Sequence, residues 1–349
     1  MVSYLKKIRS IFSDTNPRKN ALQILKEVAV LGFRYKKVPT YYMHKFMYRK
    51  DSGYYRDYLN PQEVLKIRFS PKFHRIEYLT LLKNKLASAL YFEHCKLPVP
   101  LLTSYNVKNN FFSEGKKTKI HTGEELVQYF DQVMQKTGKK SLFLKDIAES
   151  GGVGCFLLNE KTLESTIKTI APSILKGSFI HQETIKQHAG ISQIYNDSLN
   201  TLRYETFIDR EGRPQIVCVY MRFGINGNFV DNAFSGGIYV SIDPETGRFH
   251  KKGYKKFKGE IGAKSIYEHP NTGFVFENYQ VPFFKEACDL VYECLKFIPD
   301  RYLGWDIAIA ESGPVLIEGN GSPFLAEMPY GGYRKHKLAK EILSELNLS

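Results

Sequence analysis

Hydrophobic residues in this chain are spaced as in helices over roughly the first hundred residues and as in strands further on. Apolar side chains recur every three to four positions in residues 20–31 and 79–94, so each segment is predicted to form an amphipathic helix. Beyond Pro98, short apolar runs alternate with further helical segments. The pattern predicts a helical N-terminal extension followed by a mixed α+β fold.

Capping and turn residues divide the region after the extension into elements. Thr122 and Glu125 form a capping box, which predicts a helix from this point to about residue 136, with Gly138 just beyond its end. Further helices are predicted around residues 163–170 and over 282–297. The apolar runs predicted as strands are residues 141–146, 155–158, 178–182, 200–208, 216–223 and 238–242.

Two apolar runs near the C-terminus, residues 307–310 and 315–317, are predicted to pair as an antiparallel hairpin across a Glu-Ser-Gly-Pro turn. Asp306 and Glu318 would lie opposite each other, and Asn320 shares the face of Glu318 because side chains alternate along a strand. Two carboxylates and an amide oxygen suit Mg²⁺. The alternative is a hairpin whose acids face solvent, but the apolar neighbours predict burial, and a buried acid needs a partner.

A lysine and a glycine-rich loop follow one of the central strands. Lys145 lies near the end of that strand, and the loop after it contains Gly151, Gly152 and Gly154. Such a loop lets backbone N–H groups approach phosphate oxygens, and the lysine supplies a mobile positive charge. A plain turn is the alternative, since the Lys-Ser/Thr pair of a P-loop is absent.

These elements, in their order and spacing, resemble the ATP-grasp superfamily. They are Lys85 after a helical segment, Lys145 on a strand, the glycine loop, the segment Gln182-Glu183-Thr184-Ile185, and the hairpin with Asp306, Glu318 and Asn320. Segments between residues 180 and 325, such as HQETIKQH, NTLRYETFID and DNAFSGG, are similar to the branch called sugar-transfer associated ATP-grasp proteins. The resemblance covers most of residues 80–330.

The resemblance implies a fold of two α+β subdomains that clasp ATP. Residues 76–185 would form the first subdomain with the glycine-rich loop, and residues 186–349 the second with the metal site, after a helical basic region in residues 1–75. The implied nucleotide-binding residues are Lys85, Lys145, Gly151, Gly152, Gly154, Gln182, Glu183 and Ile185, the backbone of the last two contacting adenine. Asp306, Glu318 and Asn320 match a site for two Mg²⁺ ions, and Asn232 matches an Asn-x-x-x-Gly-Gly element near the transferred phosphate.

The activity that the resemblance implies is an ATP-dependent carboxylate–amine ligase that works through an acyl phosphate. A sugar acid or amino acid and an amine are the expected substrates, in the biosynthesis of a bacterial capsule or another surface polysaccharide. The alternatives are an ATP-grasp kinase, an ester-forming ligase, or a non-catalytic ATP-binding protein of polysaccharide assembly. Intact metal ligands argue against the last of these.

One position departs from the ATP-grasp pattern. Several ATP-grasp ligases have an arginine two residues before the first metal-binding aspartate, and here that position is Gly304. The positive charge needed beside an acyl phosphate must then come from elsewhere. Arg203 and Arg222 are the candidates, each on a predicted strand, and Arg203 would orient the acceptor carboxylate or stabilise the oxyanion. The alternative for both is an arginine on the surface of a strand.

Length and composition exclude several classes of protein. The 349 residues are enough for two or three domains with substantial cores. No run of about 18 apolar residues is present, and residues 1–12 lack the apolar stretch of a secretory signal. The five cysteines have no CxxC or metal-binding spacing, which predicts reduced thiols in a cytoplasmic protein.

Basic residues are concentrated near the N-terminus. Residues 1–80 contain 17 Lys and Arg against 6 Asp and Glu, which accounts for +11 of the formal net charge of +14. Residues 33–50 interleave these charges with aromatic side chains, which suits peripheral contact with the inner membrane face or with polysaccharide machinery. A solvated basic face is the alternative. A nucleic-acid partner is not expected, because no nucleic-acid motif accompanies the segment.

Overall fold

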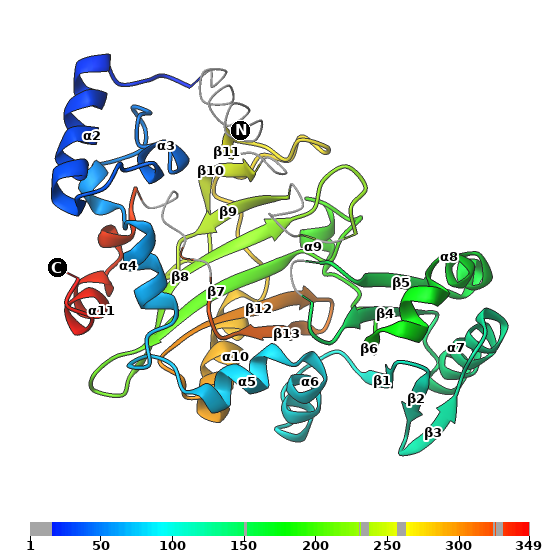
Figure 1. Cartoon of the computed structure of the whole chain (residues 1–349). Coiled ribbons are helices and arrows are strands. Elements are labelled where there is room, and N and C mark those ends of the chain that lie inside the picture. The colour runs from blue at the N-terminus through cyan, green and yellow to red at the C-terminus, as the bar shows by residue number, and fades with distance from the viewer. Residues whose placement is uncertain are drawn as a thin grey trace.

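Two antiparallel sheets lie side by side in the computed structural model, which describes residues 16–149, 152–229, 231, 237–256, 263–323, 325 and 331–348 (Figure 1). Helices cover the outer faces of the sheets, and a helical N-terminal part lies against the second sheet, away from the first. The predicted mixed α+β architecture is confirmed. In the described ranges, no helix combines the length and the apolar character needed to cross a bilayer.

Six strands of the described chain form the first sheet, in the order β3-β2-β1-β6-β4-β5. They are β1 (Leu102–Val107), β2 (Asn110–Ser113), β3 (Lys116–Lys119), β4 (Ser141–Asp146), β5 (Cys155–Asn159) and β6 (Ser178–Glu183). Helices α7 (Gly123–Thr137) and α8 (Leu163–Lys176) pack on one face through a core that includes Leu142, Leu144 and Phe179. Because side chains alternate along a strand, Phe143 and Lys145 point to the opposite face.

Within the described ranges, the second sheet has seven strands in the order β11-β10-β9-β8-β7-β12-β13. They are β7 (Thr201–Ile208), β8 (Pro214–Phe223), β9 (Ile238–Ile242), β10 (Phe249–Lys256), β11 (Ala263–Ile266), β12 (Tyr302–Ala310) and β13 (Gly313–Asn320). Helix α10 (Phe284–Phe297) packs on one face against Leu202, Val219, Trp305 and Ile307. The alternate residues of the same strands, among them Arg203 and Asp306, face the other way.

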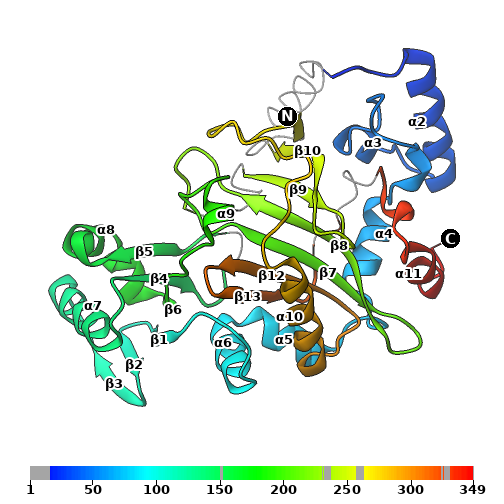
Figure 2. The same cartoon turned by 180° about the vertical axis from the view of Figure 1, so that it is seen from behind.

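The N-terminal and C-terminal helices pack together beside the second sheet (Figure 2). Ile67 and Phe73 share one core with Phe207, Tyr302 and Ile342. The helices of this region are α2 (Ala21–Tyr35), α3 (Tyr41–His44), α4 (Pro61–Arg68) and α11 (Ala339–Glu345). A separate small cluster of mostly aromatic residues, including Tyr42, Met47 and Tyr58, holds α2 and α3 together.

The helix predicted over residues 79–94 is wrong in one respect, because the structure has two helices there. Helix α5 (Ile76–Lys83) ends at Asn84, and α6 (Lys85–His94) begins directly after it. Asn84 has extended backbone angles, and its side chain accepts a hydrogen bond from Ala87 N at 3.0 Å, so it caps the second helix. The break places Lys85 at a helix N-terminus, where its side chain is free to reach the first sheet.

His181 on β6 is expected to make the fold less stable as the pH falls below about 6.5. The buried imidazole lies between Ser104 Oγ, 2.7 Å from Nδ1, and Asn106 Oδ1, 3.0 Å from Nε2. Burial lowers its pKa to about 3. Since an unfolded histidine titrates near 6.5, acid favours the unfolded chain, by roughly 2 kcal/mol between pH 7 and pH 5.

Urea unfolding at the two pH values checks this expectation. The variant His181→Gln keeps a polar side chain that does not titrate, so its free energy of unfolding should fall by roughly 2 kcal/mol less over the same pH interval. An equal fall in variant and wild type would contradict the assignment.

Candidate active site

A cavity of about 1160 Å³ lies between the two sheets. It is lined by the face of the first sheet opposite α7 and α8 and by the face of the second sheet opposite α10. The predicted site residues that line it are Lys85, Lys145, Gly152, Gln182, Glu183, Ile185, Arg203, Arg222, Asp306, Glu318 and Asn320. Gly154 is not among the lining residues, and Gly151 and Asn232 lie outside the described residues.

The C-terminal hairpin pairs as predicted. Asp306 on β12 is the register partner of Glu318 on β13, and Asn320 is opposite Gly304. The register shifts after this pair, since Ile307 is opposite Leu316 and leaves Ile317 as an extra residue on β13. A bulge of this kind increases the local twist and re-aims side chains, and it lies beside the two acids.

Asp306 is held by two arginines from neighbouring strands. Arg203 Nη2 donates to Asp306 Oδ2 at 2.9 Å, and Arg203 Nε donates to Oδ1. Arg222 Nη2 lies 3.0 Å from Oδ2, and the Asn320 amide nitrogen lies 3.4 Å from the same oxygen. Burial alone would raise the pKa of Asp306, but the two guanidinium charges outweigh it and lower the pKa to about 2. The carboxylate is therefore ionised at any physiological pH.

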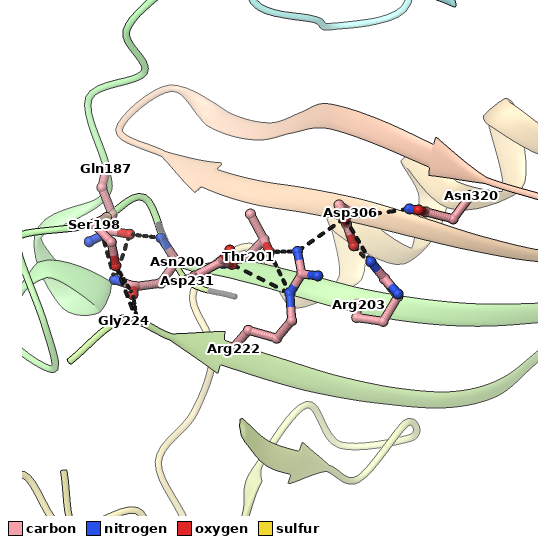
Figure 3. A network of polar contacts seen from close by, with 10 residues as sticks. All are labelled: Gln187, Ser198, Asn200, Thr201, Arg203, Arg222, Gly224, Asp231, Asp306 and Asn320. Atoms are coloured by element: carbon pink, nitrogen blue, oxygen red, sulfur yellow. Dashed lines mark hydrogen bonds and ion pairs between the residues drawn. The ribbon is translucent and has the colours of Figure 1, made fainter. Parts of the chain in front are cut away.

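Both arginines are enclosed, which removes the alternative of surface arginines. The side chains of Arg203 and Arg222 are only 10% and 15% exposed. Arg222 Nε also lies 3.2 Å from Thr201 Oγ1 and 3.5 Å from Asp231 Oδ2. Figure 3 shows these side chains in one network of contacts that ends at Asn320.

The same network continues to the segment that joins the two sheets (Figure 3). Thr201 N donates to Asp231 at 2.9 Å, and the neighbouring Asn200 side chain donates to Gln187 Oε1 at 3.0 Å. Asn200 also accepts from Ser198 Oγ at 2.8 Å. Nothing in the local sequence pattern of Thr201, Asn200 or Gln187 indicates that they share a network.

Two lysines from different elements meet near the hairpin. Lys145 projects from β4 into the cavity, and burial lowers its pKa while the nearby Glu318 carboxylate opposes that effect. Lys85, at the start of α6, donates through Nζ to the backbone oxygen of Glu149, where the glycine-rich loop begins. The cavity thus has two lysines on the first sheet and α6, opposite a second-sheet wall where Asp306 and Glu318 lie with Arg203 and Arg222.

The segment after β6 forms the connection between the sheets. Gln182 is buried, and its side-chain oxygen Oε1 has no hydrogen-bond partner among the described residues. Glu183 uses its backbone N–H for Leu101 O at 3.0 Å, and its side chain pairs with Lys139 at 2.5 Å. Of the backbone groups predicted to contact adenine, the N–H of Glu183 is therefore already used within the fold.

Arg203→Lys is expected to lower the free energy of unfolding by about 1–2 kcal/mol, because a lysine keeps the charge but loses the two-pronged contact with Asp306. Arg213→Lys is the matched control: Arg213 pairs with Asp209 at 2.8 Å, but its side chain is 67% exposed, and the change should cost less than about 0.5 kcal/mol. Equal losses in the two variants, measured by urea unfolding, would argue against a buried clamp.

The family model for sugar-transfer associated ATP-grasp proteins matches residues 65–340. The match covers well over half of the chain, so this protein belongs to that family, and the family predicted from the sequence is confirmed. No curated protein matches the chain.

Several solved structures are similar in fold. D-alanyl-alanine synthetase A from Vibrio cholerae has 13% sequence identity and a TM-score of 0.44, with 78% of this chain and 66% of that chain covered. N5-carboxyaminoimidazole synthase from Aspergillus clavatus has 11% identity and a TM-score of 0.44, with 78% and 53% covered. The ATP-grasp ligase PsnB has 13% identity and a TM-score of 0.42, with 78% and 61% covered. The matched part is less than two thirds of each of these solved chains.

Proposed function

We propose that this protein is an ATP-dependent, ADP-forming ligase that joins a carboxylate to an amine through an acyl phosphate. One observation carries the proposal. The cavity between the sheets brings Lys85 and Lys145 to one wall, and Asp306, with Arg203 and Arg222 on either side of it, to the opposite wall. Such a cavity has positive groups for a triphosphate and for an acceptor carboxylate, and anionic groups for a metal ion.

The donor set of the hairpin fits Mg²⁺. Asp306 and Glu318 are cross-strand partners that supply carboxylate oxygens, and the Asn320 side chain beside them, whose amide nitrogen faces Asp306 in this structure, also carries an amide oxygen. Within the described residues, no group of three or more His, Cys, Asp and Glu gathers, so phosphate oxygens would complete the coordination of the two predicted ions. When bound, Mg²⁺ would neutralise phosphate charge and favour transfer of the γ-phosphoryl group.

ATP itself is expected along the first sheet. Lys85 and Lys145 would neutralise phosphate oxygens, and Gly152 lines the same part of the cavity. The unpartnered Gln182 Oε1 is an acceptor that suits an amino group such as that of adenine. An adenine at the connection between the sheets would also satisfy a buried polar atom that otherwise costs free energy.

In this reaction the protein would position the reactants and neutralise their negative charges. A carboxylate oxygen of the acceptor attacks the γ-phosphorus, and the bond to the bridging oxygen of ADP breaks. The amine nitrogen then attacks the carbonyl carbon of the acyl phosphate, loses a proton, and expels inorganic phosphate. Arg203 and Arg222 would orient the acceptor and stabilise the negative oxygen of the tetrahedral intermediate. Exclusion of water from the cavity during the reaction would limit hydrolysis of the acyl phosphate.

The acceptor is expected to be a sugar acid or an amino acid. The description of the family, sugar-transfer associated, supports a role in capsule or other surface polysaccharide biosynthesis. We place this activity in the cytoplasm, with the basic N-terminal region in peripheral contact with the membrane or the polysaccharide machinery.

Product analysis tests the proposal. Purified protein, Mg²⁺ and ATP are incubated with uronic acids and amino acids, each with and without small amines. ADP and free phosphate that form only when both partners are present would support the ligase. A phosphorylated acceptor without free phosphate would make the protein a kinase, an ester product would make it an ester-forming ligase, and AMP would overturn the mechanism.

A further inference from the structure

Helix α2 has an apolar stripe on its outer face that packs against nothing in the described structure. Leu22, Leu25 and Phe33 are 81%, 65% and 87% exposed, and they lie with Ala29 at the spacing of one helix face. Val38, just beyond the helix, is 82% exposed. We name Leu22, Leu25, Ala29, Phe33 and Val38 the α2 stripe.

The stripe is separate from the face that holds the helix to the protein. On the inner face, Leu31 is buried against the aromatic cluster that includes Tyr42 and Tyr58. Glu27, also buried, accepts from Tyr42 at 2.5 Å and pairs with Lys19 at 3.0 Å. The helix is therefore docked by one face, and among the described residues the apolar outer face packs against no other element. Large apolar side chains gathered on a surface indicate a partner.

The exposed charges of residues 16–50 all have one sign. Residues 16–50 contain nine Lys and Arg and one acidic residue. That acidic residue is Glu27, which is buried and already paired. The exposed charges beside the stripe are those of Lys26, Arg34, Lys36 and Lys37. An apolar stripe within exposed basic residues complements a surface that offers both hydrocarbon and negative charge, which is an anionic lipid bilayer.

Helix α2 lies away from the cavity, so a contact made by its outer face would not cover the cavity. The helix lies at the edge of the molecule, beyond the second sheet and on the side away from the first (Figures 1 and 2). We propose that the α2 stripe inserts into the interface of an anionic bilayer, with Lys26, Arg34, Lys36 and Lys37 against lipid headgroups. The contact does not depend on the proposed ligase activity.

Vesicle flotation of the full chain tests the proposal, without nucleotide. Wild-type protein should float with vesicles of phosphatidylglycerol and phosphatidylcholine, and it should stay in the dense fraction with vesicles of phosphatidylcholine alone. Binding to the anionic vesicles should weaken as the salt concentration is raised. The double variant Leu25→Glu/Phe33→Glu should bind the anionic vesicles at least about tenfold more weakly. Because both side chains are solvent-exposed, the variant should fold and bind ATP as the wild type does.

The matched control is Val107→Glu/Val275→Glu. These valines are 44% and 59% exposed and lie outside the basic region, so the pair changes the net charge by the same amount and removes exposed apolar surface elsewhere. The control should float like the wild type. Failure of the wild type to bind anionic vesicles, or an equal loss in both double variants, would overturn the proposal. So would a dimer in solution that Leu25→Glu/Phe33→Glu dissociates, because the stripe would then be a contact between two copies.

Discussion

Glu318→Gln is expected to reduce turnover of ATP by at least about a thousandfold while the chain stays folded. Glu318 faces Asp306 across the hairpin and lines the cavity. The substitution keeps the size of the side chain and removes the negative charge that would hold Mg²⁺. Steady-state turnover gives the effect, and circular dichroism with urea unfolding checks the fold.

Glu293→Gln is the control for this variant. Glu293 lies on α10, outside the cavity, and its side chain is 51% exposed in a pair with Lys296. The control should keep wild-type turnover. A folded Glu318→Gln protein with turnover within a few-fold of wild type would contradict the assignment of this hairpin to metal binding.

Lys145→Met is expected to weaken ATP binding by about a hundredfold and to raise the free energy of unfolding by about 1 kcal/mol. The two effects have one cause. The Lys145 ammonium is desolvated in the cavity wall, which lowers its pKa and disfavours the charged form in the absence of nucleotide. A methionine of similar length removes that cost and the attraction for phosphate together.

Isothermal titration with ATP and urea unfolding measure the two effects of Lys145→Met. Lys140→Met is the control, because Lys140 lies just before the same strand and is exposed. It should change neither quantity by much. If Lys145→Met bound ATP as the wild type does, Lys145 would not be a nucleotide ligand.

The sequence predicted those parts of the site that depend on local patterns. Two apolar runs on either side of a turn predicted the hairpin. The pairing of its two strands predicted that Asp306 and Glu318 would lie opposite each other, as they do. The strand with Lys145 and the capping box at Thr122 were also local signals, and the structure has both. Each of these features is decided within about fifteen residues of chain.

Contacts between distant strands could not be predicted in this way. Arg203 and Asp306 are register partners on β7 and β12, 103 residues apart. Arg203 was proposed to orient an acceptor, and in this structure it is bound to the carboxylate proposed as a metal ligand. Binding of a metal ion by Asp306 would therefore have to weaken these ion pairs, which would leave the arginines available to another anion. No spacing in the sequence indicates such an exchange.

Several strands were also absent from the prediction because their burial pattern is weak. Strand β3, with the sequence KKTK, is exposed throughout, and β10 carries four lysines in eight residues. Strand β1 is more central, but it buries polar Ser104 and Asn106, which bond to His181 on the neighbouring strand. Side chains that satisfy a buried partner in another strand look like loop residues when the sequence is read alone.

A crystal structure with Mg²⁺ and a non-hydrolysable ATP analogue would show whether the cavity binds nucleotide and metal as proposed. We expect the analogue between the two sheets, its phosphates beside Lys85 and Lys145, its adenine at residues 182–185, and Mg²⁺ on Asp306, Glu318 and Asn320. An analogue bound outside this cavity, or bound there with its metal on other residues while both arginines still hold Asp306, would contradict this expectation.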